Sequence, residues 1–321
     1  MRSTLETNTG LFNGLTGRIK NYFIFLKNDL KDNKASYLFL APFWLIFFIF
    51  TILPVFIAIF LSFTYYNMLE PPQWVGWHNY LRLFLDDDVF LIAIQNTFVF
   101  AIVTGPVSYI ASLLIAWMVN EFKPRIRAFL TFLFYAPVLS GQAFFLWTIV
   151  FSGDAYGYAN SFLLYWGIIS EPVQWFQDPS YIMPIAIICV LWGSLGTAFL
   201  AFIGGLQGID VTLYEAGAVD GIRNRWQELW YITLPQIAPH MLFGAIMTVT
   251  QSFLAAEQLI SLVGFPSTDY AARTIVTHLL DFGNIRFEMG YAATIAVVLF
   301  AAMVGLNILI QKYLGKLKGD A

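Results

Sequence analysis

Charge and cysteine are both scarce in this sequence. Of its 321 residues, 12% are charged, whereas soluble domains carry about 25% charged residues. The single cysteine, Cys189, excludes a disulfide within the chain, and its place in an apolar run is typical of a small buried residue. The three histidines lie too far apart for the spacing of a metal site. With a net charge of −3, the chain offers no basic face to nucleic acid.

Motifs for nucleotide binding and for catalysis are missing as well. The dipeptide Gly315-Lys316 is followed by Leu317 and lacks the upstream glycine of a phosphate-binding loop. We therefore expect no nucleotide site and no cofactor in the chain itself. No nucleophile–base constellation is evident, which disfavours a membrane enzyme. No signal peptide is evident either, because the first 34 residues are polar with scattered basic residues.

Long hydrophobic runs are what the sequence has in abundance, and 59% of its residues are hydrophobic. A helix needs about 20 mostly apolar residues to cross a bilayer. Several of the runs contain proline, which spanning helices tolerate where neighbours satisfy the freed backbone groups. The sequence therefore predicts an all-α membrane protein with six transmembrane helices. The predicted spans are residues 36–64, 91–119, 126–151, 181–206, 240–264 and 289–311.

The basic residues predict the orientation of these spans. If both termini are cytoplasmic, every Lys and Arg falls on the inner side except Arg82, Arg273 and Arg286. This asymmetry predicts cytoplasmic termini and places residues 213–239 in the cytoplasm. We expect a cytoplasmic segment at 1–35, a six-helix transmembrane domain at 36–312 whose cytoplasmic loop is 207–239, and a cytoplasmic tail at 313–321.

The N-terminal segment has an amphipathic pattern. One helical face is apolar and the rest is basic, which predicts an interfacial helix on the inner leaflet. A partly disordered tail is the alternative. The apolar residues are Leu15, Ile19, Tyr22, Phe23, Leu26 and Leu30.

Aromatic residues gather in the predicted outer loops at 65–90 and 152–180. Some belong to the interfacial belt where a membrane meets water. Others could form a docking platform or a surface on which a sugar ring stacks.

The polar stretch at 213–239 is the longest interruption between two apolar segments. Thr212 and Glu215 have the spacing of a capping box, so a helix is expected to start there. Asp220-Gly221 is a turn signal. A second helix should run over 224–233, because Pro235 and Pro239 come after it. Such a slim hairpin could enter a groove on another protein, or it could simply join two spans.

Polar residues inside the predicted spans are few. Glu257 is the acidic one, about 25 Å along the fifth span if that span is one straight helix. It either faces a cavity or partner, or lies at the outer end and reaches water. The others either line a route through the membrane or join helices, which is the commoner role. These are Asn96, Gln142, Ser194 and Gln251, with Trp192 as a stacking surface.

The hairpin residues resemble a known motif. Glu215-Ala216-Gly217-x3-Gly221 followed by Ile232-x-Leu234-Pro235 resembles the EAA loop of permease subunits in ABC importers. Several further residues and segments are similar to the carbohydrate branch of that family. They are Tyr214, Asp220, the 231–235 ending, the segment Trp74-Val75-Gly76-Trp77-His78-Asn79-Tyr80, Asn96-Thr97 and Gly205-Leu206-Gln207. The resemblance extends over nearly the whole chain.

Two departures from the family pattern stand out. Gly217 occupies a position where the family usually has alanine. Ten residues separate Gly221 from Ile232, where nine are usual. One extra residue rotates a regular helix by ~100°, so the face that the second helix presents to a partner is in question.

The resemblance implies a transmembrane subunit of an ATP-driven carbohydrate importer, with an oligosaccharide as cargo, in the bacterial inner (cytoplasmic) membrane. Its implied partners are a second permease of different sequence, two ATPase subunits that bind ATP and Mg, and an extracellular solute-binding protein. Glu215 would anchor to a basic residue of the ATPase, while Gly221 would allow the turn and Asp220 would stabilise it. The implied coupling residues are Glu215, Ala216, Gly217, Asp220 and Gly221.

Rival functions stay open from the sequence alone. One is an ABC permease for another solute, such as a phosphate ester or a peptide. Another is an ion-coupled secondary transporter, although the paired ionisable residues and the inverted repeat expected of one are not found. A third is a membrane scaffold for a signalling ATPase.

Overall fold

The computed structural model describes residues 29, 32–140 and 143–314, and these residues are mostly helical. The predicted interfacial helix lies largely outside the described residues, as do Gln142 and the tail from residue 315. The chain divides between Phe60 and Leu61 into two compact units. The predicted boundaries at 35 and 312 stay predictions.

The first unit is a single apolar helical run. It comprises α2 (Lys34–Phe47), the π-helical turn η1 (Phe48–Ile52) and most of α3 (Leu53–Ser62). The π-helical turn comes directly before Pro54, whose missing N–H removes one helical hydrogen bond. The whole run, Lys34–Ser62, is 29 residues long and apolar enough to cross a membrane.

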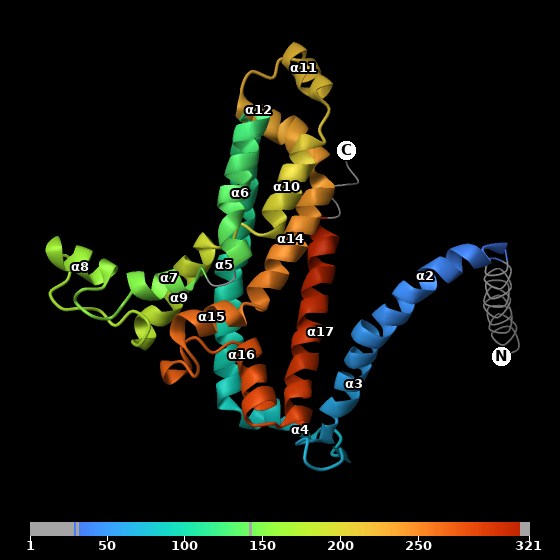
Figure 1. The fold of residues 1–321 in the computed structure, drawn as a ribbon, viewed down its shortest axis with the longest axis vertical. Coiled ribbons are helices and arrows are strands. Elements are labelled where there is room, and N and C mark those ends of the chain that lie inside the picture. The colour runs from blue at the N-terminus through green and yellow to red at the C-terminus, as the bar shows by residue number, and fades with distance from the viewer. Residues whose placement is uncertain (1–28, 30–31, 141–142, 315–321) are drawn as a thin grey trace, which may run out of the picture. The chain divides into compact units, whose positions relative to one another are not determined.

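The second unit is built around α5 (Asp88–Asn120). Helices α10 (Thr197–Gln207) and α14 (Ala238–Phe253) pack against α5 and against each other, and α17 (Met289–Leu314) packs on α14 (Figure 1). Small residues let these helices approach closely. A Cβ on Gly105 of α5 would lie 3.5 Å from the hydroxyl of Ser252 in α14.

Shorter elements connect these helices. Strand β1 (Thr64–Tyr65) pairs antiparallel with β2 (Gln73–Trp74). The remaining elements are α4 (His78–Leu81), η2 (Arg82–Asp86), α6 (Pro124–Ser140), α7 (Phe145–Val150), α8 (Tyr158–Tyr165), α9 (Pro179–Trp192), α11 (Val211–Val219), α12 (Arg225–Glu228), η3 (Leu229–Thr233), α13 (Leu234–Gln236), α15 (Ala256–Val263), η4 (Thr268–Tyr270), α16 (Ile275–Leu280) and η5 (Asp281–Ile285).

Four helical runs of the described residues are long and apolar enough to span a membrane, or up to five if one bent pair counts as a span. They agree with the predicted first, second, fourth and sixth spans, and confirm a multi-pass helical membrane protein. None of these runs matches the predicted third or fifth span, so the count of six stays a prediction. The four runs are Lys34–Ser62, Asp88–Asn120, Pro179–Gln207 and Met289–Tyr313.

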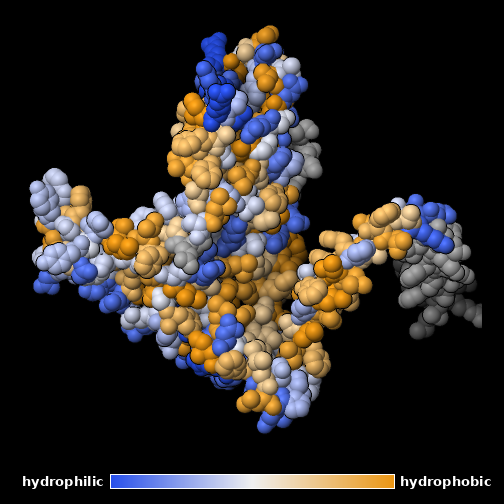
Figure 2. All heavy atoms as spheres, viewed as in Figure 1, coloured by the Kyte–Doolittle hydropathy of each residue, from blue (hydrophilic) through white to orange (hydrophobic). Residues whose placement is uncertain are grey.

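Apolar side chains lie both in the interior and on the surface of the second unit. Cys189 is fully buried, as its apolar context predicts. Helix α17 exposes Phe300, Val304 and Ile308, and hydrophobic residues cover its visible flank in Figure 2. A helix that is apolar on its outer face as well as its inner one is typical of a lipid-facing span.

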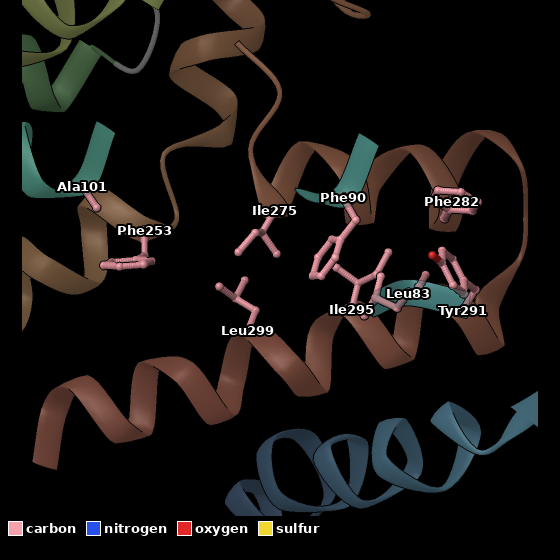
Figure 3. Close-up of a cluster of buried hydrophobic side chains, with 10 residues drawn as sticks. Leu83, Phe90, Ala101, Phe253, Ile275, Phe282, Tyr291, Ile295 and Leu299 are labelled. Atoms are coloured by element: carbon pink, nitrogen blue, oxygen red, sulfur yellow. The ribbon is translucent and has the colours of Figure 1, made fainter. Parts of the chain in front are cut away.

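A buried cluster holds α5, α16 and α17 together at one end of the second unit (Figure 3). Phe90 and Ile295 are fully buried in it. Burying one such side chain stabilises the fold by about 1.5–3 kcal/mol. The cluster comprises Leu83, Phe90, Ala101, Phe253, Ile275, Phe282, Tyr291, Ala292, Ile295 and Leu299.

A polar network lies beside this cluster and is centred on Asp87. The Asp87 carboxylate caps α5 by accepting a hydrogen bond from the Phe90 N–H at 2.9 Å. It also accepts from the Tyr291 hydroxyl at 2.7 Å and bonds His278 Nε2 at 2.9 Å. Arg273 Nε donates to His278 Nδ1 at 3.1 Å. Because a guanidinium only donates, Nδ1 accepts, and Nε2 carries the proton shared with Asp87.

Three arginines extend the network at the predicted outer side. Asp281 binds both the buried Arg273 and, at 2.9 Å, Arg286. Arg82 pairs with Glu288 at 2.6 Å. Burial by itself raises the pKa of Asp281, but the arginines outweigh it and lower that pKa. The network therefore joins α5, α16 and the start of α17 through charged side chains that each have a partner of opposite charge or a hydrogen bond.

We expect the Asp87 carboxylate to make stability depend on pH. Burial raises its pKa, but hydrogen bonds from His278 and Tyr291 outweigh this and lower the pKa from 3.8 to about 2. Its stabilising contribution is therefore complete above pH ~4 and is lost as the pH falls toward ~2. Asp87→Asn keeps a good helix cap but removes the charge, and should lower stability at neutral pH by about 1–3 kcal/mol.

Thermal unfolding in detergent between pH 7 and 2 checks this expectation. The difference in unfolding temperature between wild type and Asp87→Asn should become smaller below pH ~4. The neighbouring exposed Asp88, changed to Asn, is the matched control and should behave like wild type. A difference in unfolding temperature that stays constant down to pH 2 would contradict the role given to Asp87.

Candidate functional site

Three of the predicted spans are interrupted. The fourth leaves helical geometry at residues 193–196, between α9 and α10, and the fifth at Leu254 and Ala255, between α14 and α15. The third is divided into α6 and α7. Non-helical backbone at membrane depth is tolerated where it is buried in protein or lines a cavity.

The glycines explain one of these interruptions. Gly193 and Gly196 flank Ser194, and residues of this kind leave a helix at little cost. Gly193 also lies against the ring of Phe144, since a Cβ there would be 2.9 Å from the Phe144 Cζ. The break at Leu254 and Ala255 has no glycine or proline, so there is no local sign of it in the sequence.

The interruptions border a common cavity of about 380 Å³. This volume falls in the range of about 300–1,000 Å³ that is usual for small-molecule pockets. The lining comes from α5, α6, α9, α14 and α15 as well as from the breaks. The lining residues are Thr104, Ser108, Pro137, Val138, Phe144, Val190, Gly193, Ser194, Gly196, Thr248, Gln251, Ser252, Leu254, Ala255, Glu257, Gln258 and Ser261.

Three of the predicted pathway residues meet in this cavity: Ser194, Gln251 and Glu257. The Gln251 amide donates to the Thr197 hydroxyl at 3.1 Å, and the Ser194 hydroxyl donates to the Leu191 carbonyl at 2.7 Å. These bonds orient the side chains and leave acceptor positions for a ligand.

Glu257 lies in the first turn of α15. The predicted distance of about 25 Å along one straight helix is therefore wrong, because the chain turns at Ala255 before Glu257. The Glu257 backbone carbonyl accepts a hydrogen bond from the Ser261 hydroxyl at 2.8 Å. Its carboxylate has no hydrogen-bond partner or ion pair among the described residues.

Two other predicted pathway residues lie elsewhere. The Asn96 amide donates to the carbonyls of Tyr270 and Arg273, at 3.0 Å each, and thus joins α5 to the loop that follows α15. Trp192 contacts the edge of Trp147, with ring centres 5.5 Å apart, and does not line the cavity. For Asn96 the structure favours the interpretation as a residue that joins elements.

Several lining residues were missed from the sequence, among them Phe144, Gln258 and Ser261. A usable signal existed for Thr104 and Ser108, which lie four residues apart on one face of α5. No such signal existed for Phe144, because the packing at the breaks positions it.

The hairpin that the sequence predicts to be cytoplasmic begins at Asp210 rather than at Thr212. The Asp210 carboxylate accepts from the Thr212 N–H at 3.0 Å and caps α11, so the predicted capping box of Thr212 and Glu215 is wrong. Gly221 has a φ of 97°, and the Ile222 N–H donates to the Gly217 carbonyl at 2.9 Å. This is the usual left-handed glycine termination of a helix.

The residues that the family resemblance implies for coupling differ in exposure. Glu215, Ala216, Asp220 and Gly221 are exposed, whereas Gly217 is buried. A Cβ on Gly217 would lie 2.6 Å from the Ile232 Cδ1, so glycine lets α11 approach η3 closely. The Asp220 carboxylate accepts no hydrogen bond within the described residues, and its role in the turn stays a prediction.

The second helix of the hairpin is longer than predicted. Asn224 caps it by accepting from the Gln227 N–H at 2.9 Å, and it continues through Pro235 to Gln236. The π-helical turn η3 precedes Pro235 and accommodates its missing N–H. A π-helical turn also holds one residue more than an α-helical turn. A turn of this kind can hold an inserted residue without the ~100° rotation that the insertion would cause in a regular α-helix.

A sharp bend connects this helix to α14. The axes of Arg225–Gln236 and Ala238–Phe253 differ by 82°. Ile237 lies at the bend and is fully buried. The hairpin is thus fixed at an angle to the helix that carries Gln251 and ends beside the cavity.

Arg225 ties the hairpin to the end of α5. It pairs with Glu121 at 2.7 Å and with Glu228 at 2.6 Å. Trp117 of α5 and Trp226 of α12 lie next to these pairs, with ring centres 5.3 Å apart. Exposed ion pairs are each worth about 0–1 kcal/mol, so this contact holds the hairpin without locking it.

Comparisons with known proteins agree with this architecture. A family described as "Binding-protein-dependent transport system inner membrane component" matches residues 93–316. The chain is 31% identical over 286 residues to the probable ABC transporter permease protein YesP of Bacillus subtilis (strain 168), covering 87% of this chain and 90% of YesP.

Two further relatives are transport permeases. The chain is 29% identical to the lactose transport system permease protein LacF of Rhizobium radiobacter, covering 85% of this chain and 92% of LacF. It is 28% identical to the arabinooligosaccharides transport system permease protein AraP of Bacillus subtilis (strain 168), covering 89% of this chain and 90% of AraP.

Solved structures share the fold. A chain of a bacterial alginate ABC transporter, in complex with an alginate pentasaccharide-bound periplasmic protein, superposes with a TM-score of 0.74 at 22% identity. This match covers 91% of our chain and 97% of that chain. A second structure, of a bacterial ABC transporter involved in importing the acidic polysaccharide alginate, gives a TM-score of 0.71 at 26% identity, covering 89% and 98%.

The contact at Arg225 can be tested by charge reversal. Arg225→Glu should increase hydrogen exchange in residues 211–236 by about two- to fivefold, because it repels Glu121 and Glu228. Adding Glu121→Arg should restore much of the protection. Arg223→Glu is the matched control, since Arg223 makes no ion pair within the described chain. Equal exchange in all variants would show that the contact does not hold the hairpin.

Proposed function

We propose that this chain is the transmembrane permease subunit of an ATP-driven carbohydrate importer. The chain belongs to the family of binding-protein-dependent transport system inner membrane components. The observation that carries the proposal is a cavity of amides, hydroxyls and one carboxylate at the interruptions of the spanning helices. Interrupted helices around a central cavity are a recurrent way of forming solute sites in transporters.

An oligosaccharide is the cargo class that we favour. Relatives over most of the chain's length are permeases named for lactose and for arabinooligosaccharides. Gln251, Gln258 and Ser194 offer both donors and acceptors, as sugar hydroxyls require. Apolar residues such as Phe144 and Leu254 complement the C–H faces of a sugar ring.

We further propose six membrane spans with both termini in the cytoplasm, in the bacterial inner membrane. The broken pairs α6–α7 and α14–α15 would serve as the third and fifth spans. The distribution of Lys and Arg supports this orientation. The segments at 1–35, 36–312 and 313–321 would then be the cytoplasmic N-terminal segment, the permease domain and the cytoplasmic tail.

The partners follow from this assignment. A second permease completes the route, two ATPase subunits bind ATP and Mg in the cytoplasm, and an extracellular binding protein delivers the sugar. The exposed Glu215, Ala216 and Asp220 would contact the ATPase, with Gly217 and Gly221 shaping the loop. No nucleotide or catalytic metal is assigned to this chain.

Coupling then follows from geometry. Movement of the ATPases would displace the hairpin, which is continuous with α14 across the 82° bend and is tied to α5 by Arg225. The breaks beside Ser194 and Ala255 are places where short helices can pivot. The proposed route would thereby alternate between an inward-facing and an outward-facing form.

An ion-coupled mechanism receives less support. Coupled transporters normally carry several ionisable groups within the membrane. Among the described residues that line the cavity, Glu257 is the only ionisable one.

Reconstitution tests the proposed function. The complete complex in proteoliposomes, with its binding protein, should accumulate a neutral sugar such as lactose or arabinotriose in an ATP-dependent manner. Peptides and phosphate esters serve as comparison solutes. Uptake by this chain alone, driven by an ion gradient, would refute the proposal. Stimulation by peptides or phosphate esters only would refute the carbohydrate assignment.

The hairpin residues provide a second test. Glu215→Ala and Gly221→Leu should leave membrane insertion intact and reduce uptake by about tenfold or more, because they remove an interfacial charge or strain a left-handed turn. ATP hydrolysis should fall less than uptake. Gly221→Asn is the matched control, since asparagine tolerates this conformation. Wild-type uptake in Glu215→Ala and Gly221→Leu would remove the hairpin from the coupling mechanism.

A further inference from the structure

The charge around the central cavity is of one sign. Within the described chain, no Lys, Arg or His lines it, and Glu257 is its only ionisable residue. Arg82, Arg273 and Arg286 lie instead around a separate pocket with Asp86, Asp87 and Asp88. A ligand in the central cavity therefore meets a negative charge and no positive one from this chain.

The Glu257 carboxylate is also available to a ligand. Its side chain is exposed, and no described residue pairs with it or donates a hydrogen bond to it. The Ser261 hydroxyl, one turn later, bonds the Glu257 backbone carbonyl and not the carboxylate. The position in the first turn of α15 favours a negative charge there.

We propose that this cavity accepts an uncharged glycan and excludes anionic ones, with Glu257 as the specificity-determining group. The inference rests on the proposed function in taking the cavity as part of the sugar route. It adds the charge class of the cargo and the residue that selects it.

The Glu257 carboxylate would both bind a neutral sugar and repel an anionic one. Hydroxyls of a neutral sugar donate to a carboxylate in charge-assisted hydrogen bonds. A carboxylate or sulfonate on the sugar would be repelled at ~5–6 Å in a half-enclosed site of effective dielectric ~20, which amounts to a preference of about a hundredfold or more for the neutral ligand. Nothing in the described lining offsets this repulsion.

The shared fold does not settle this point. The solved structures that superpose on the chain come from transporters of alginate, which is an acidic polysaccharide. The same architecture therefore serves an anionic cargo in those proteins. In this chain the lining residues, and Glu257 above all, favour a different charge class.

Cysteine labelling measures the selection without knowledge of the cargo. Ser261→Cys places a thiol one helical turn from Glu257, and the native Cys189 is buried. The complex in nanodiscs is labelled with two methanethiosulfonates of similar size, one carrying trimethylammonium and one carrying sulfonate. After correction for their reactivity with a free thiol, the cationic reagent should react faster. Glu257→Gln should lower the ratio of cationic to anionic rates by about tenfold.

The controls make the result specific. Glu171→Gln makes the same chemical change at an exposed loop position outside the cavity and should leave the ratio unchanged. Unmodified protein with serine at 261 reports any labelling of Cys189. The inference is overturned if the anionic reagent reacts as fast as the cationic one beside Glu257, or if Glu257→Gln does not change the ratio.

Transport provides the second measurement. Reconstituted complex should accumulate arabinotriose and not trigalacturonate, and Glu257→Gln should raise the ratio of acidic to neutral uptake. Equal or faster uptake of trigalacturonate by the wild type would overturn the inference. If neither sugar accumulates while the labelling ratio still depends on Glu257, charge selection by the cavity stands and the carbohydrate assignment fails.

Discussion

A backbone N–H or C=O without a partner costs several kcal/mol in hydrocarbon, and the rest of this structure depends on that cost. This cost forces the chain into helices. The helices can break only where other protein groups, or water in a cavity, provide hydrogen bonds for the freed backbone groups. The breaks at 193–196 and at Leu254–Ala255 border one cavity. The feature that makes this a membrane protein thus also determines where a polar solute can be held.

Helix α5 connects two differently built ends of the second unit. At one end, Asp87 caps the helix inside a network of compensated charges, in which Arg273 and Asp281 are buried. At the other end, Glu121 meets the hairpin through the exposed Arg225. Removing a partner from a buried pair is strongly destabilising, whereas exposed pairs contribute little. One end is therefore held firmly, and the other is free to follow the hairpin.

Local signals in the sequence predicted much of the hairpin and part of the cavity. Gly221 was correctly identified as a turn because Asp-Gly is a strong local signal. The helix start was misplaced, because Asp210 competes for the cap with Thr212 and the sequence pattern does not rank them. Ser194, Gln251 and Glu257 were predicted pathway residues because polar residues are rare in apolar spans, and all three line the cavity. Phe144 and Ser261 were not, because their place in the cavity depends on breaks in other helices.

The sequence by itself determined the helical class, the approximate position of the spans and the glycine that ends α11, because hydropathy and backbone preference act over a few neighbouring residues. Tertiary structure alone decided that Asn96 joins α5 to a distant loop while Gln251 faces a cavity. It also decided that the predicted fifth span breaks at Leu254 and Ala255, where the sequence has no glycine or proline. These outcomes depend on contacts between segments far apart in the chain, and such contacts cannot be predicted from a local sequence pattern.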